Sequence, residues 1–140
     1  WKRAIRVFEQ IRTLAPDDSG ARKRLIDLNL KMMNRSQGLS ELDNYLSYLS
    51  EHPSKENDVV EMLEELIGDH PAIAQLHRML GEQYSNLDER DKAIKEYDLA
   101  AEMFLEAGEN EQAIKTINNI LGMNPDNAEE YRQVLSQILS

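Results

Sequence analysis

The sequence predicts an all-α protein of about eight helices. Its 140 residues include only six glycines and four prolines, and β-branched residues are sparse. Apolar residues recur at the spacing i, i+3, i+4 and i+7 that places them on one face of a helix. Ala4, Phe8 and Ile11 form one such stripe. No stretch alternates between apolar and polar residues for long enough to predict a strand.

Capping residues and glycines indicate where the helices begin and end. One of Asp17, Asp18 or Ser19 is expected to cap the second helix. Because the connections are short, neighbouring helices are expected to be antiparallel. Capping boxes are expected at Ser40–Asp43 and Asp126–Glu129, and helix ends or turns at Gly38, Gly68, Gly108 and Gly122. The expected helices span residues 1–14, 18–34, 40–51, 56–68, 72–86, 90–106, 110–122 and 127–139.

Four prolines follow the expected helices with one common spacing. An apolar or aromatic residue stands eight and five residues before each proline. A pattern that recurs in this way is typical of stacked repeat units. The prolines are Pro16, Pro53, Pro71 and Pro125, and the residues before them are Phe8, Ile11, Tyr45, Tyr48, Leu63, Leu66, Ile117 and Ile120.

A second pattern lies between residues 77 and 100. His77, Leu80, Gly81 and Tyr84 fall in one helix, and Ala93, Tyr97 and Ala100 fall in the next. This arrangement resembles the tetratricopeptide repeat (TPR) family, whose unit is a helix–turn–helix of about 34 residues. Ala113 and Pro125 belong to the same repeat motif, whereas Leu105 stands where the closing proline of the family is expected. The resemblance implies a right-handed α-solenoid of antiparallel helix pairs.

Glycine inside a helix costs about 1 kcal/mol relative to alanine, so Gly81 requires a compensating contact. Because the two helices of a TPR-like unit pack closely, Gly81 is expected to leave room for the small Ala93 opposite.

Residues 1–140 are expected to form a single TPR-like domain. The spacing divides it into a half repeat at 1–16, repeats at 17–53, 54–90 and 91–125, and a half repeat at 126–140. If inner and outer helices of the solenoid alternate strictly along the chain, the second, fourth, sixth and eighth helices are the inner ones. The TPR-like match instead makes the fifth helix, at 72–86, an inner one. Both interpretations stay open around residues 54–90. Because the first residue is Trp1 and each end leaves an apolar stripe uncovered, we expect a fragment of a longer chain.

The resemblance implies a non-catalytic protein–protein interaction module that holds a peptide or helix of a partner in a concave groove. One alternative is a structural spacer or oligomerisation segment of a larger repeat protein. Another is a regulatory domain attached to a catalytic or DNA-binding module outside these residues. Asp98 and Glu102 stand where the carboxylate-clamp subclass of the family uses Lys and Asn, which disfavours that subclass. The residues expected to line the groove are Lys23, Asp27, Lys31, Lys95, Asp98, Glu102, Glu106 and Arg132.

Composition and charge exclude several classes of function. The net charge is −10, and residues 36–140 carry −15 whereas residues 1–35 carry +5, so nucleic acid is not expected as a partner. The sequence has no cysteine and no apolar run of the length that a membrane span needs. His52, His70 and His77 show no metal-ligand spacing, and no catalytic or phosphate-binding motif is present. We therefore expect no enzyme, metal, cofactor or membrane contact, a cytoplasmic location, and head-to-tail self-association through the uncovered terminal helices.

Overall fold

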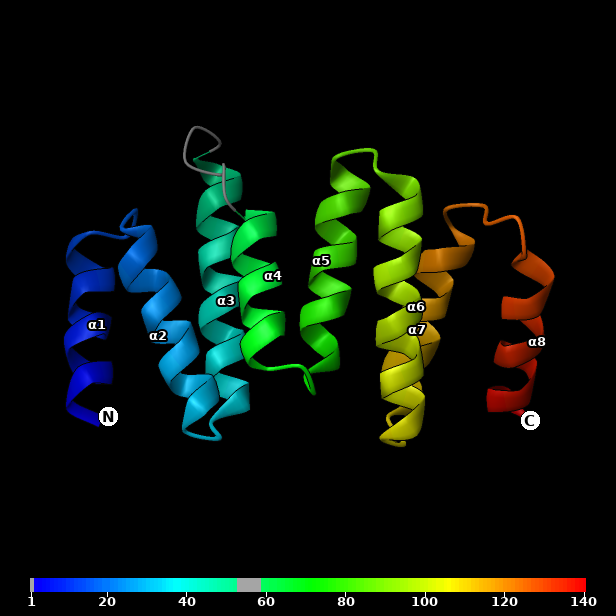
Figure 1. Ribbon diagram of the computed structural model, residues 1–140, viewed down its shortest axis with the longest axis horizontal. Coiled ribbons are helices and arrows are strands. Elements are labelled where there is room, and N and C mark those ends of the chain that lie inside the picture. Colours follow the sequence, from blue (N-terminus) through cyan, green and yellow to red (C-terminus); the bar gives the residue numbers. More distant parts are fainter. Residues whose placement is uncertain (1, 53–58) are drawn as a thin grey trace. The chain divides into compact units, whose positions relative to one another are not determined.

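The computed structural model describes residues 2–52 and 59–140. Within these ranges the chain forms eight helices and no strand (Figure 1), so the predicted all-α class is confirmed. Trp1, Pro53 and the expected start of the fourth helix at residue 56 lie outside the described residues. The helices are α1 (Lys2–Leu14), α2 (Ser19–Lys31), α3 (Arg35–Glu51), α4 (Val59–Asp69), α5 (Ala74–Asn86), α6 (Arg90–Glu106), α7 (Asn110–Leu121) and α8 (Ala128–Leu139).

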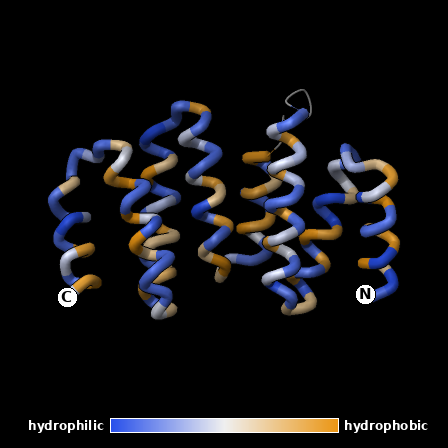
Figure 2. The backbone as a smooth tube through the Cα atoms, turned by 180° about the vertical axis from the view of Figure 1, so that it is seen from behind, coloured by the Kyte–Doolittle hydropathy of each residue, from blue (hydrophilic) through white to orange (hydrophobic). Residues whose placement is uncertain are grey.

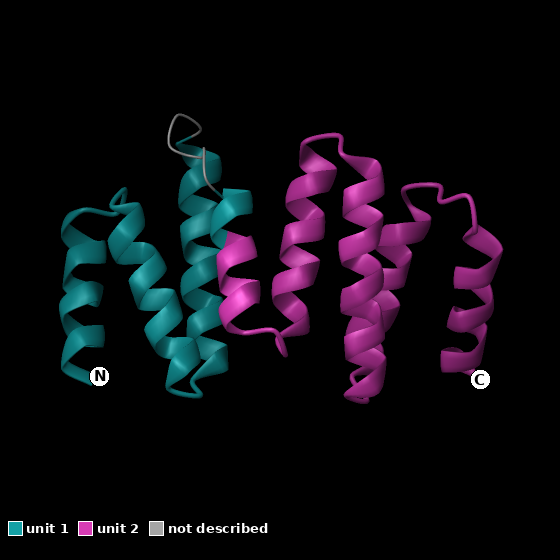
Figure 3. Cartoon of the chain, viewed as in Figure 1, with its two compact units in different colours: residues 1–62 teal, residues 63–140 magenta. Residues whose placement is uncertain are grey.

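The chain divides into two compact units, residues 1–62 and 63–140, with the boundary inside α4 (Figure 3). Within each unit consecutive helices run antiparallel, as they do in an α-solenoid (Figure 1). In the first unit α2 packs against both α1 and α3. In the second unit α6 packs against α5 and α7, and α8 packs against α7.

The core of the first unit is centred on α2. Every residue from Leu25 to Leu30 is buried, because α1 and α3 both pack on this helix. Leu42, Tyr45 and Leu49 add the buried face of α3. In contrast, no residue of α1 is fully buried, although hydrophobic residues recur along this helix (Figure 2).

Among the described residues, two hydrophobic clusters form part of the core of the second unit. In one, Phe104 of α6 packs among the alanines Ala74, Ala100 and Ala113, which come from three helices. In the other, Ala93, Tyr97 and Ile120 pack with the partly buried Tyr84, Ile94, Met123 and Tyr131. Alanines at these places let neighbouring helices approach closely while larger rings fill the space between them.

The close contact at Gly81 differs from the one expected. A Cβ atom on Gly81 would lie 2.9 Å from Cδ1 of Tyr97, and the three nearest heavy atoms all belong to that ring. Gly81 therefore makes room for Tyr97 and not, as expected, for Ala93. Gly38 has a similar role in α3, where a Cβ would lie 2.7 Å from Cδ2 of Leu30.

One expected helix start and two expected capping boxes are wrong. The third helix begins at Arg35 instead of residue 40, so Ser40 is interior and cannot cap it, and Gly38 does not end a helix. Asn127, not Asp126, is the N-cap residue of α8, and its Nδ2 donates to Oε2 of Glu130 at 3.3 Å. The expected cap of α2 is confirmed, since Oδ1 of Asp18 accepts a hydrogen bond from the Ala21 N–H.

Three connections close with the same turn. After α2, α5 and α6, one residue takes a left-handed conformation, and the next N–H donates to the carbonyl five residues before it. This is the Schellman arrangement that satisfies the last carbonyls of a helix. The left-handed residues are Met33 (φ 59°), Asp88 (φ 60°) and Gly108 (φ 75°), and the bonds are Asn34–Asn29 (2.9 Å), Glu89–Tyr84 (2.9 Å) and Glu109–Phe104 (2.8 Å).

Candidate functional site

A stripe of charged side chains follows the exposed side of α6. Lys95, Asp98, Glu102 and Glu106 are all exposed, and their spacing of three or four residues places them on one helical face. Among the side-chain hydrogen bonds of the described residues, one involves the stripe: Oδ1 of Asp98 accepts from the Tyr131 hydroxyl at 3.0 Å. This bond connects the stripe to α8.

Tyr131 connects the stripe on α6 to the core of the second unit. Its ring packs beside Ala93, Tyr97 and Ile120. Burial, followed by the hydrogen bond to Asp98, raises the pKa of Tyr131, so its hydroxyl stays protonated and donating near neutral pH. Next to it on α8, Arg132 is exposed and pairs with Glu129 at 3.3 Å.

The remaining predicted site residues lie on α2, in the first unit. Lys31 is exposed, Lys23 is half-buried, and Asp27 is only 9% exposed. Nζ of Lys31 lies 3.0 Å from Oδ2 of Asp27, so this pair stabilises α2. Asp27 is therefore unsuited to direct contact with a partner. The structure links the stripe on α6 to α8 through Asp98 and Tyr131, whereas the predicted Arg132 pairs with Glu129 of its own helix. The predicted residues of α2 lie in the other unit.

Several side chains in the second unit also form hydrogen bonds to groups that lie about one repeat length away in the sequence. The bonds connect helices or connections that are two helices apart in the chain. Their separations of 33 or 34 residues match the length of about 34 residues that a TPR unit has. The pairs are Arg78–Gln112 (3.1 Å), Arg90–Met123 carbonyl (2.9 Å), Arg90–Asn124 carbonyl and Asp98–Tyr131 (3.0 Å).

Sequence reasoning missed a buried polar network in the first unit. Arg22 is 4% exposed, donates to the Pro16 carbonyl at 3.0 Å and to Oδ1 of Asn44 at 2.8 Å, and lies over the rings of Tyr45 and Tyr48. Desolvation lowers the pKa of Arg22, against the attraction of Glu41. The signal in the sequence was an arginine where a repeat unit should carry an apolar residue.

Glu41 is the acidic member of the same network. It is 4% exposed, and its Oε1 pairs with Nη1 of Arg12 and accepts from Nε2 of Gln37 at 3.2 Å. Its Oε2 is buried without a hydrogen-bond partner. Arg12 is thus the charged contact that joins α1 to α3.

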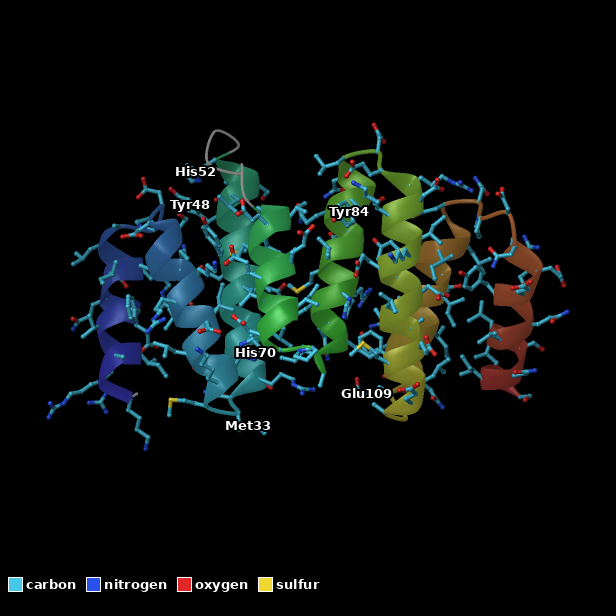
Figure 4. The ribbon with its side chains drawn as sticks, in the orientation of Figure 1. Met33, Tyr48, His52, His70, Tyr84 and Glu109 are labelled. Atoms are coloured by element: carbon cyan, nitrogen blue, oxygen red, sulfur yellow. The ribbon has the colours of Figure 1, made fainter. Side chains whose placement is uncertain are left out.

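The described residues contain no group of three or more His, Asp or Glu side chains that could hold a metal ion. His52 stacks on Tyr48 with ring centroids 4.2 Å apart, and His70 lies on the connection between α4 and α5 (Figure 4). His77 is half-buried, and its Nδ1 lies 2.8 Å from Oε2 of Glu96. His52 and His77 thus each contact another side chain, and His70 lies in a connection between two helices. In the described part of the chain, no helix is both long and apolar enough to cross a membrane.

Neither a protein-family model nor a curated protein matches this sequence. Among solved structures, the chain is similar to the crystal structure of TTC0263, a thermophilic TPR protein in Thermus thermophilus. The two share 20% sequence identity over 96% of this chain and 88% of that one, with a TM-score of 0.35. This similarity is too low to assign the chain to a family, so the fold described above rests on the helices of this chain and their contacts.

Proposed function

We propose that the chain is a non-catalytic protein–protein interaction module that binds a peptide or helix of a partner. The binding surface is the α6–α8 face of the second unit, which consists of the charged stripe on α6 and of Tyr131 on α8, the residue that bonds to Asp98. The observation that supports this most is the exposed stripe of Lys95, Asp98, Glu102 and Glu106. It follows most of a 17-residue helix whose opposite face carries the buried residues Ala93, Tyr97, Ala100, Ala101 and Phe104. Side chains held on a rigid helix reduce the ordering cost of binding.

The charge of the second unit indicates the kind of partner. Residues 63–140 contain sixteen acidic and six basic residues, a net charge of −10. A field of this sign attracts a basic segment and repels nucleic acid. We therefore propose a basic peptide or helix as the partner.

Site-specific photo-crosslinking tests the proposal. A photoreactive residue at position 102 should capture a discrete protein from the native cell extract, and one at the exposed position 111 of α7 should not. If both positions capture the same proteins, or neither captures any, the structural-spacer alternative is favoured. The regulatory-domain alternative stays a prediction that the sequences flanking this chain would test.

Head-to-tail self-association is a second candidate, because no described residue of α1 or α8 is fully buried. On α8, Arg132, Leu135, Ser136 and Leu139 border an open apolar groove, and Leu139 is 70% exposed. Sedimentation equilibrium should show a mass that rises with concentration and falls on Leu139→Glu. A constant monomer mass would remove this candidate.

A further inference from the structure

A pocket of about 490 Å³ opens in the first unit, beside the turn that joins α2 to α3. Ile5, Met32 and Met33 give it an apolar wall. Lys2 and Arg6 are exposed on its α1 side, with Glu9 as the acidic residue among the described lining residues. The pocket therefore combines apolar surface with an excess of positive charge.

Met33 is an unusual residue for its position at the turn between α2 and α3 (Figure 4). It is 90% exposed, so the core does not require its side chain, and its φ of 59° is unfavourable for a residue with a Cβ. The matching turns carry Asp88 and Gly108, which tolerate this conformation better. An exposed methionine in a strained conformation beside a pocket is suited to contact with a ligand.

Charge and polar groups around the pocket define what fits it. Residues 1–35 carry a net charge of +5, in contrast with the rest of the chain. Asn34 and Gln37, which also line the pocket, are exposed amides that can bond to the N–H and C=O groups of a peptide. A nucleic acid would satisfy the basic residues but would leave the apolar wall unused.

We propose that this pocket binds an acidic linear segment of a partner protein, with one apolar side chain seated among Ile5, Met32 and Met33. Lys2 and Arg6 hold the flanking carboxylates of the segment. This second docking site lies in the other unit from the α6–α8 face and prefers a ligand of opposite charge, so it goes beyond the proposed function. A single pocket buries little surface, and the affinity is therefore expected to be weak, about 10 µM to 1 mM.

Fluorescence anisotropy with a labelled peptide of four Glu-Glu-Leu repeats tests the site in the full chain. Arg6→Glu should weaken binding about tenfold, because it places a negative charge beside the carboxylates. Arg3→Glu is the matched control, since Arg3 is exposed on the same helix, lies outside the pocket and changes the net charge equally. It should weaken binding less than about twofold. Met33→Gly should weaken binding several-fold without unfolding the protein.

Several results would overturn the proposal. Equal weakening by Arg3→Glu and Arg6→Glu would mean that net charge alone attracts the peptide. Failure of the wild-type chain to bind the Glu-Glu-Leu peptide would remove the site. Equally tight binding of a Lys-Lys-Leu peptide would also remove it if Met33→Gly weakens that binding, because binding of a basic peptide to the α6–α8 face does not involve Met33. Tighter, Arg6-dependent binding of a single-stranded oligonucleotide would identify a nucleic-acid site instead. A concentration-dependent mass that Arg6→Glu abolishes would identify a second copy of the chain as the occupant.

Discussion

The ring of Tyr97 on α6 occupies the space that a side chain on Gly81 of α5 would need. A Cβ on Gly81 would lie 2.9 Å from Cδ1, 3.0 Å from Cε1 and 3.1 Å from Cγ of that ring. Tyr97 is 5% exposed and packs against Ala93 and Ile120, so the ring has little freedom to move. The most extensive helix contact in the second unit, between α5 and α6, depends on this missing side chain.

Gly81→Ala should lower the free energy of unfolding by up to about 2 kcal/mol. Overpacking against the ring costs about 1–3 kcal/mol, and the gain of about 1 kcal/mol in helix propensity offsets only part of it. Gly68→Ala in α4 is the matched control, because a Cβ there meets nothing within 4 Å, and it should stabilise by up to about 1 kcal/mol. Urea unfolding followed by circular dichroism measures both. Equal effects would contradict the proposed contact.

Met33→Gly should raise the free energy of unfolding by about 1 kcal/mol. Glycine adopts the observed φ of 59° without steric cost, and the exposed methionine contributes no core packing. Gly108→Ala should have the opposite effect, since its φ is 75° in the matching turn after α6. Thermal unfolding compares the two variants with the wild type. A destabilised Met33→Gly protein would show that the side chain supports the fold.

Arg12→Met should destabilise the first unit by about 1–3 kcal/mol, because it leaves the buried carboxylate of Glu41 without its charged partner. This loss of stability is smaller than the loss expected for a fully buried ion pair, since the Arg12 side chain is 29% exposed. In a Glu41→Gln background the same change should cost at least about 1 kcal/mol less. Urea unfolding of the four proteins gives this coupling energy. Additive effects would mean that the pair does not join α1 to α3.

Tyr84 should give stability a pH dependence in alkaline solution. Burial and the hydrogen bond from its hydroxyl to Glu64, at 2.9 Å, raise the pKa of Tyr84 from 10.0 to about 12. The folded state therefore holds the proton more tightly than the unfolded state does. The resulting stabilisation is complete below pH 10 and is lost as the pH rises through about 12.

Spectrophotometric titration of the phenolate, as the difference between wild type and Tyr84→Phe, measures this pKa. Glu64→Gln should lower it, because the negative charge that opposes ionisation is gone. A difference titration centred near 10 in the folded wild-type protein would contradict the role given to Glu64.

The repeated spacing of apolar residues made the helices predictable. Among the described residues, the helices other than α3 lie close to their expected ranges, since period, proline and capping signals are local properties of the chain. The start of α3 was missed, because Gly38 was interpreted as a turn residue. It is instead an interior glycine whose role depends on Leu30 of the preceding helix.

The sequence by itself determined the helical class and the charged stripe of α6, because both follow from side chains a few residues apart. It also determined the antiparallel order, because the connections are short. Only the tertiary structure decided which groups meet. It placed Tyr97 against Gly81, Asp98 against Tyr131, and Arg22 and Glu41 inside the first unit. These pairings depend on how closely separate helices approach, and a one-dimensional pattern of residue types does not encode that distance.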